Sequence, residues 1–571
     1  MEVIALLVLV GIVALLRSKL QRDGGPDVGW SANGGPTEQA TSASAAAIER
    51  GSERAVARAL GRVESRRLAG GFSFSLGITF SLLIVVLFGI VWAADFEERW
   101  ENIWLNAPIY AYPLVGMTIV GVHAAVTRER RDGTAELFAS CPVTPAVRTV
   151  GHLRTAWVPV VAVVAFLALF GLASISQSSA FGSIPLRTAG DVLAALTLAV
   201  GATFLGVAVG RWAPWWPAPI VAIVLVAVVS SRISGIGEPG HWSQRRQLST
   251  FPRYPDYDPV FAIRPVWWHL AWLVALCAAT AVVALLHDRR DRLVTTAGGI
   301  TVVALLVTGV GTSRPLDENE AELVASMVAH PERHQDCIER VEGSFCTYDG
   351  FEDLGRMFAD ELEPVLAGLP AAAPDGIVMR QLFDDRLEEL DPEVRDRLPS
   401  TAQLTGADVN LGYSSHPEVF DASRISVGLW AVGLPAWARP DASVQVIAGE
   451  ARGVIALWIA ARGLAPEDAA DLASAHPDPN AADPPTAFVL GMAWPEPCEV
   501  GPAPVAWARQ DLAAARALLA LPEPEVRAGI DEDWAVLTDP DTTTAELMDR
   551  FGLPSVGPID ELQPEVWECT Y

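Results

Sequence analysis

Long runs of apolar residues, separated by short polar stretches, fill the chain up to about residue 311. A bilayer core of ~30 Å requires about 20 apolar residues in a helix that rises ~1.5 Å per residue. Continuous rather than alternating apolarity favours helices, since only helices and closed barrels pair every backbone amide in lipid. The pattern predicts seven spanning helices, over about residues 73–93, 107–126, 155–175, 190–209, 214–231, 266–287 and 293–311.

Arginines indicate the side of the membrane on which each connection lies. The connection between the first two runs is mainly acidic, whereas those after the second and sixth runs are basic, with Arg128, Arg130, Arg131, Arg148, Arg289, Arg290 and Arg292. Residues 232–264 are the exception, because this connection is expected outside but contains several arginines. Because basic connections stay in the cytoplasm, the spans are expected to start inside and to leave residues 312–571 as an exoplasmic domain.

The N-terminal segment is apolar between Val3 and Leu16 but is short for a spanning helix. Glu2 has the wrong charge for the basic start of a secretory signal peptide. We interpret residues 1–17 as a membrane anchor, with a monotopic or frayed segment as the alternative. Residues 18–52 are rich in Gly, Ser, Ala, Thr and Pro and predict a flexible cytoplasmic linker.

Residues 53–69 predict a basic amphipathic helix directly before the first span. Apolar side chains fall on one helical face, while arginines recur on another, with Arg58, Arg62, Arg66 and Arg67 closest to the span. Such a helix is expected to lie in the membrane interface with its guanidinium groups among lipid phosphates. The alternative is a solvated helix that only supplies positive charge on the inner side.

The cytoplasmic connection between the second and third runs, residues 128–152, contains a second predicted helix. Asp132 or Thr134 can cap it, and Glu136 would then complement the dipole of its first turn. Pro142 and Pro145 are expected to end it. A short charged helix held between two spans can bind a groove on a soluble partner and transmit a push to both spans. The alternative is a capped surface turn.

This connection resembles the matching loop in the permease subunit of ABC-2 type ATP-binding cassette exporters. The family pattern is E-R-x-x-G-T-x-E-x-L followed by a proline. The chain has Leu137 one position early and Phe138 where the pattern has leucine, and it supplies the other positions as Glu129, Arg130, Gly133, Thr134, Glu136 and Pro142. The resemblance covers about residues 53–290 and includes the amphipathic elbow helix. The seventh span departs from the family core of six.

The resemblance implies a bacterial cell-membrane exporter in which a separate ATPase subunit binds ATP and pushes on residues 128–152. It implies a second permease copy, so that the complex is a homodimer or a heterodimer. The six matching residues and the displaced Leu137 would be coupling residues rather than catalytic ones. Lys19 is the only lysine of the chain and is followed by Leu20. A P-loop therefore cannot form, because its lysine must be followed by Ser or Thr.

Cargo and further partners are less constrained by the sequence. The spans contain few charged residues, which argues against a dedicated ion relay and favours an amphipathic or lipid-like cargo. Membrane lipid is an expected partner. No nucleic acid, metal or cofactor of its own is expected for this chain.

Charge separates the chain into two parts. There are 25 basic and 20 acidic side chains up to Val310, against 16 and 48 beyond it, so the formal net charge of −27 is +5 in the first part and −32 in the second. Residues 312–571 are long enough for a core of their own. The fold class predicted for the whole chain is mainly α: a polytopic membrane domain (53–311) followed by an α-rich exoplasmic domain. We expect helices over 317–330, 351–367, 380–397, 446–463, 504–520 and 541–551, with short strands near 376–381 and 406–412.

Four of the six cysteines lie in the acidic part, where an oxidising compartment would permit two disulfides. Sequence alone leaves their connectivity open, and we favour Cys337–Cys346 with Cys498–Cys569.

The acidic part contains one spacing typical of a metal site. His330 and His334 are four residues apart, but Pro331 breaks the helix that a zinc peptidase requires, and the acid of the peptidase pattern, at Glu332, is one position late. A degenerate or unrelated sequence is therefore the better interpretation. The alternatives to an exporter are a membrane-anchored exoplasmic enzyme and a structural or sensory membrane protein without transport.

Overall fold

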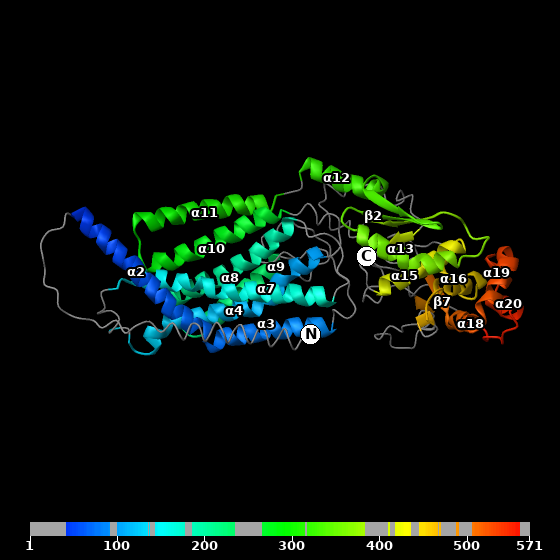
Figure 1. Cartoon of the computed structure of the whole chain (residues 1–571), viewed down its shortest axis with the longest axis horizontal. Helices are drawn as coiled ribbons and strands as arrows, with labels where there is room; N and C mark the ends of the chain where they lie inside the picture. The colour runs from blue at the N-terminus through cyan, green and yellow to red at the C-terminus, as the bar shows by residue number, and fades with distance from the viewer. Residues whose placement is uncertain are drawn as a thin grey trace.

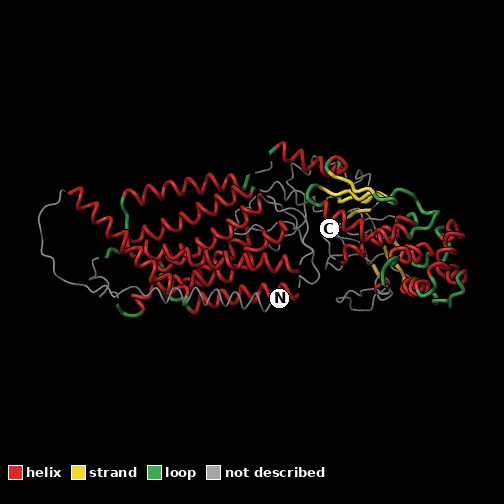
Figure 2. The backbone as a smooth tube through the Cα atoms, viewed as in Figure 1, coloured by secondary structure: helices red, strands yellow, loops and turns green. Residues whose placement is uncertain are grey.

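The computed structural model describes residues 42–91, 100–134, 136, 143–177, 186–233, 265–314, 317–382, 409–411, 417–434, 445–465, 468–469, 487–489 and 505–559. They form an elongated molecule with a helical bundle at one end and a half that combines helices with short strands at the other (Figures 1 and 2). Of the predicted N-terminal anchor and linker, residues 1–41 lie outside the described residues.

The bundle contains a helix at each of the seven stretches that the sequence pattern predicts. These helices are α3 (Phe72–Val91), α4 (Trp100–Arg131), α7 (Trp157–Gln177), α8 (Leu186–Trp212), α9 (Ala218–Ile233), α10 (Val266–Asp288) and α11 (Arg292–Thr312). Two shorter helical segments, α6 (Pro145–Leu153) and η1 (Arg154–Ala156), lead into α7.

Among the described residues, five helical segments are long and apolar enough to cross a membrane: Ile109–Arg131, Pro145–Leu172, Leu186–Trp212, Val266–Asp288 and Arg292–Thr312. A sixth candidate consists of Ser52–Ala69 and Phe72–Leu87, which are bent by 53° at the break between them. Helix α9 is apolar but shorter than these spans.

Aromatic and branched side chains fill the centre of the bundle. Phe166 and Phe170 of α7 are buried with Leu114 of α4, and the Tyr110 ring lies 5.3 Å from that of Phe170. On the outside, α11 packs on α10 and leaves large apolar side chains exposed, such as Val310 at 70%. An apolar surface of this extent is typical of contact with lipid.

Helix α2 (Ser42–Ala69) corrects the predicted boundary between linker and elbow helix. It begins at Ser42, so residues 42–52, which we expected to be part of a flexible linker, are helical. Ser42–Ala47 is rich in alanine, which has the highest helix propensity, and this explains the longer helix. The helix crosses one end of the bundle before the chain turns into α3 (Figure 1).

The acidic half is built around two small sheets. One sheet has the order β1-β2-β3-β4, with β1 (Gln335–Glu339) antiparallel to β2 (Gly343–Tyr348) and with β3 (Ile377–Gln381) and β4 (Val409–Leu411) parallel to it. The other has the order β5-β7-β6, formed by Gln445–Val446, Val505–Ala508 and Ala487–Val489. The helices are α12 (Glu318–Ala329), α13 (Glu352–Ala367), α15 (Pro417–Ala431), α16 (Ala451–Ala460), α18 (Arg509–Leu519), α19 (Glu523–Leu537) and α20 (Thr544–Arg550).

The strands change two of the helices predicted for the acidic half. The predicted helix 504–520 is a strand up to Ala508 and a helix from Arg509, because a short buried strand that runs into a helix has continuous apolarity. Residues 380–381, expected to start a helix, end β3, and the rest of that predicted helix beyond Leu382 lies outside the described residues. The predicted strands near 376–381 and 406–412 are present as β3 and β4.

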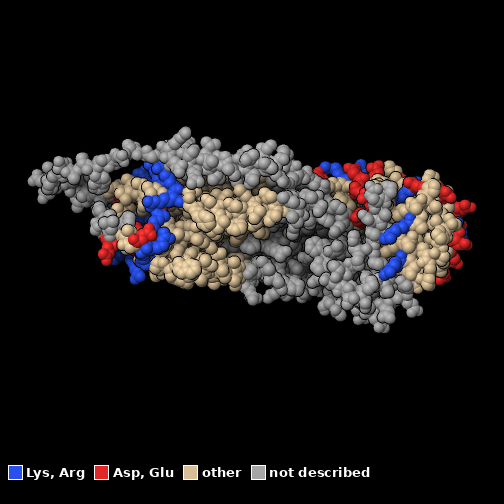
Figure 3. Space-filling model, turned by 90° about the horizontal axis from the view of Figure 1, so that it is seen from below, with Lys and Arg blue, Asp and Glu red and all other residues tan. Residues whose placement is uncertain are grey.

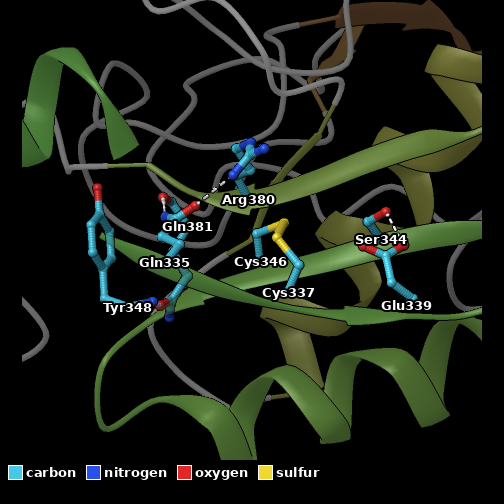
Figure 4. Close-up of a disulfide and its surroundings, with 8 residues drawn as sticks. All are labelled: Gln335, Cys337, Glu339, Ser344, Cys346, Tyr348, Arg380 and Gln381. Atoms are coloured by element: carbon cyan, nitrogen blue, oxygen red, sulfur yellow. Dashed lines mark hydrogen bonds between the residues drawn. A yellow bond between two sulfur atoms is a disulfide. The ribbon is translucent and has the colours of Figure 1, made fainter. Parts of the chain in front are cut away.

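One predicted disulfide is present between β1 and β2. Cys337 and Cys346 are opposite each other in the antiparallel pair, with their Cα atoms 4.0 Å apart, and their sulfur atoms are bonded (Figure 4). Hydrogen bonds join the strands nearby, as from Arg380 to the Gln335 side chain at 3.2 Å. Cys498 and Cys569, the other predicted pair, lie outside the described residues.

Candidate functional site

The residues that resemble the coupling loop lie at the end of the bundle where arginines gather in a band (Figure 3). We call this the arginine-rich end. It is formed by α2, the C-terminal ends of α4 and α8, α6 with η1, and the turn between α10 and α11.

Helix α4 extends further than expected and ends in a glycine cap. It continues to Arg131, and Gly133 adopts a φ of +69°. The Thr134 N–H donates to the Glu129 carbonyl at 2.9 Å and the Gly133 N–H to that of Arg130 at 3.3 Å, which is a Schellman motif. Asp132 and Thr134 therefore complete the end of α4, and the predicted helix that either could cap lies outside the described residues except for Glu136. The arginines in its last turn complement the helix dipole there.

The predicted coupling residues are spread over this end. Glu129 is partly buried and paired, while the side chains of Arg130 and Glu136 are exposed. Glu136 is helical, and the flanking residues, including Leu137 and Pro142, lie outside the described residues.

Helix α6 begins where the sequence predicted a helix to end. Pro145 occupies its first turn, where the missing N–H costs nothing, and the Thr144 hydroxyl accepts from the Val147 N–H at 3.3 Å as the cap. Pro145 thus begins a helix, a role that was not predicted, because a proline is compatible with both the exit from one helix and the entry into the next. The end of the preceding predicted helix lies outside the described residues.

Polar side chains of α6 join it to the helices on either side. Arg148 donates to the Glu129 carboxylate of α4 at 2.6 Å, and the Thr149 hydroxyl donates to the Asp288 carboxylate at the end of α10. Gly151 lies against Leu60 of α2 so closely that an added Cβ would be 2.7 Å from a Leu60 methyl carbon. Helix α6 is therefore held by α2, α4 and α10 together.

Asp288 is the most connected carboxylate of this end. It accepts from His287 at 2.7 Å and lies 3.5 Å from the Nε of Arg211 at the end of α8, in addition to its bond from Thr149. Its side chain is 5% exposed. Neither Asp288 nor Arg211 was predicted to be a functional residue, because nothing in the sequence around them indicates that the ends of two distant helices meet α6.

A second buried carboxylate joins the elbow helix to α4. Glu64 of α2, 5% exposed, lies 2.9 Å from Arg67 and 3.2 Å from Arg128 of α4. Of the four elbow arginines predicted to meet lipid, Arg67 therefore has a carboxylate partner, whereas Arg58 and Arg62 are exposed and Arg66 is half-buried.

The turn between α10 and α11 is also fixed by a carboxylate. Asp291 caps α11 by accepting from the Val294 N–H at 2.9 Å, and this bond contributes most to holding the pKa of Asp291 below its usual value.

The acidic half does not bring its candidate metal ligands together. Helix α12 ends at Ala329, so Pro331 does interrupt the helix as expected, and it starts a 3-10 turn. His330 lies 3.3 Å from Glu332, while His334 bonds to Ser326 at 2.8 Å. Within the described ranges, no group of three His, Cys, Asp or Glu side chains could hold a metal ion.

Comparisons of this chain with protein-family models, with curated proteins and with solved structures gave no match.

Proposed function

We propose that this chain is the permease subunit of an ABC-2 type exporter, whose ATP is bound and hydrolysed by a separate subunit. The observation that best supports this is the attachment of α6 to three other helices at the arginine-rich end. A force applied beside the cap of α4 would reach α4 through the Arg148–Glu129 pair and α10 through Thr149 and Asp288. Residues 128–152 would then work as a coupling element.

The number of lysines supports a separate subunit that binds the nucleotide. With Lys19 as the sole lysine and no glycine-rich loop before it, the chain has no P-loop, and a partner must supply the nucleotide site. That partner would dock on the exposed residues Arg130 and Glu136, in the cytoplasm. A second permease copy would complete the path for an amphipathic or lipid-like cargo, and the acidic half would lie on the exoplasmic side.

The backbone at Gly133 offers a sharp test. Nothing lies within 4 Å of an added Cβ, so a substitution there acts through the positive φ alone. Gly133→Val places a β-branched residue in a left-handed conformation, whereas Gly133→Asn is the matched control because asparagine tolerates that conformation. The full chain is purified from its native membrane with any bound ATPase, and ATP hydrolysis is measured per mole of chain.

We expect an ATPase to co-purify with the wild-type chain, Gly133→Val to lower hydrolysis by about ten-fold, and Gly133→Asn to stay near wild type. Membrane insertion should be unchanged in both variants. Absence of any nucleotide-hydrolysing partner, or equal activity of the valine and asparagine variants, would contradict the proposal.

A further inference from the structure

Helix α2 lies directly against the segment that leads into α7, and the two run in the same direction. Leu60 meets Gly151, Gly61 meets Arg154 and Ser65 accepts a hydrogen bond from the Trp157 indole at 2.9 Å. A Cβ on Gly61 would lie 3.1 Å from the Cβ of Arg154 and 3.8 Å from its Cδ, so the stem of this arginine crosses α2 at the glycine.

Three exposed arginines surround this crossing. Arg58 and Arg62 flank Gly61 along α2, one turn before it and one residue after it, and Arg154 comes from η1. Within the part of the chain that the structure describes, no carboxylate lies within ion-pair distance of these three side chains. Other arginines of the same end do have carboxylate partners: Arg67, Arg128, Arg131, Arg148, Arg211 and Arg289.

An apolar stripe continues from these arginines along α7. Trp157 is 45% exposed, and Val161 and Val164 on the same helical face are 38% and 48% exposed. The order along the helix is therefore a cation, an indole and then aliphatic side chains. This order matches the depth profile of a lipid, since indoles lie at the headgroup level and aliphatic chains lie deeper.

We propose that Arg58, Arg62 and Arg154 form a binding site for the headgroup phosphate of an anionic phospholipid, whose acyl chain lies along Trp157, Val161 and Val164. Guanidinium groups bind phosphate oxygens in a bidentate manner, and three of them without carboxylate partners leave a net positive charge that an anionic headgroup neutralises. The apolar stripe distinguishes a lipid from a free phosphate ion. The site does not depend on the coupling function proposed above.

The test measures the preference of the full chain for anionic lipid. The chain is reconstituted in phosphatidylcholine vesicles that contain either spin-labelled phosphatidylglycerol or spin-labelled phosphatidylcholine, and the protein-bound fraction of each label is measured. The variants are Arg58→Gln, Arg62→Gln and Arg154→Gln. Arg290→Gln is the matched control, since Arg290 is exposed at the same end of the bundle but in the turn between α10 and α11.

We expect the wild type to prefer phosphatidylglycerol, each of the three single changes to reduce this preference about five-fold, and the control to retain it. Inorganic phosphate should not displace the bound lipid label. The proposal is overturned if the three variants keep the wild-type preference, if Arg290→Gln loses as much as they do, or if inorganic phosphate competes and so reveals a site for a free anion.

Discussion

Single buried carboxylates hold together parts of this molecule that are distant in sequence. In the acidic half, Asp511 of α18 is fully buried and accepts hydrogen bonds from the Gly449 and Ala508 N–H groups at 2.9 Å and from the Thr544 hydroxyl at 2.6 Å. It thereby joins α18 to the segment before α16 and to the first residue of α20. Burial nevertheless raises the pKa of Asp511, which shows that desolvation outweighs these bonds for the charged form.

The raised pKa of Asp511 predicts the direction in which the stability of the fold changes with pH. Between the ordinary carboxyl pKa and the raised pKa of Asp511, the folded state binds more protons than the unfolded state, so stability falls as the pH rises through that interval and then levels off. Asp511→Asn should fold, because its amide oxygen can accept both backbone bonds and its amide N–H can donate to Thr544. The variant should lack this pH-dependent loss, as measured by thermal unfolding of the full chain from pH 4 to pH 8.

Asp511→Ala serves as the comparison, since it leaves two buried N–H groups without an acceptor and should cost about 3 kcal/mol. A wild-type chain that gains stability relative to Asp511→Asn as the pH rises would contradict the assignment, because it would mean that the hydrogen bonds outweigh burial.

Among the elements, α6 shows most clearly why contacts must be known before a role can be assigned. Arg148 and Glu129 belong to different helices, and their side chains are 15% and 28% exposed. Removing either partner leaves the other charge partly buried and unpaired. We expect Glu129→Gln and Arg148→Gln each to destabilise the full chain by about 2 kcal/mol, and the double variant to cost little more than one of them.

Thermal unfolding in detergent measures the stability of the two single variants and of the double variant. Asp132→Asn is the control. Asp132 pairs with Arg131 at 3.4 Å, but their side chains are 49% and 62% exposed, so this change should cost less than about 0.5 kcal/mol. Effects of the two Glu129 and Arg148 changes that simply add would show that the ion pair does not join α4 to α6.

The positions of the helices in the bundle were predictable, because a long continuous apolar run is typical of a membrane-spanning helix. The contacts at the arginine-rich end were not predictable. The glycine at position 133 was identified, but its role as the cap of α4 was not, since a capping aspartate or threonine beside a glycine is equally typical of a helix start. Asp288 and Glu64 gave no signal, because ion pairing depends on residues far along the chain. In the acidic half, short buried strands such as β7 have the same apolar pattern as a helix segment.

At the scale of the whole molecule, the chain joins a bundle with apolar helices to an acidic half that carries a disulfide. The bundle ends in the arginine-rich band on the side away from the acidic half (Figures 1 and 3). An odd number of crossings would place these two ends on opposite sides of a membrane, with the band in the cytoplasm. The coupling role of residues 128–152 requires this arrangement, since ATP is supplied on the inner side.

Labelling of introduced cysteines in intact cells tests this arrangement most directly. Val341, in the turn between β1 and β2, is 97% exposed, and the Glu136 side chain is exposed beside the cap of α4. We predict that a membrane-impermeant maleimide labels Val341→Cys in intact cells and labels Glu136→Cys only after the membrane is permeabilised. Labelling of Glu136→Cys from outside intact cells, with Val341→Cys protected, would contradict the account.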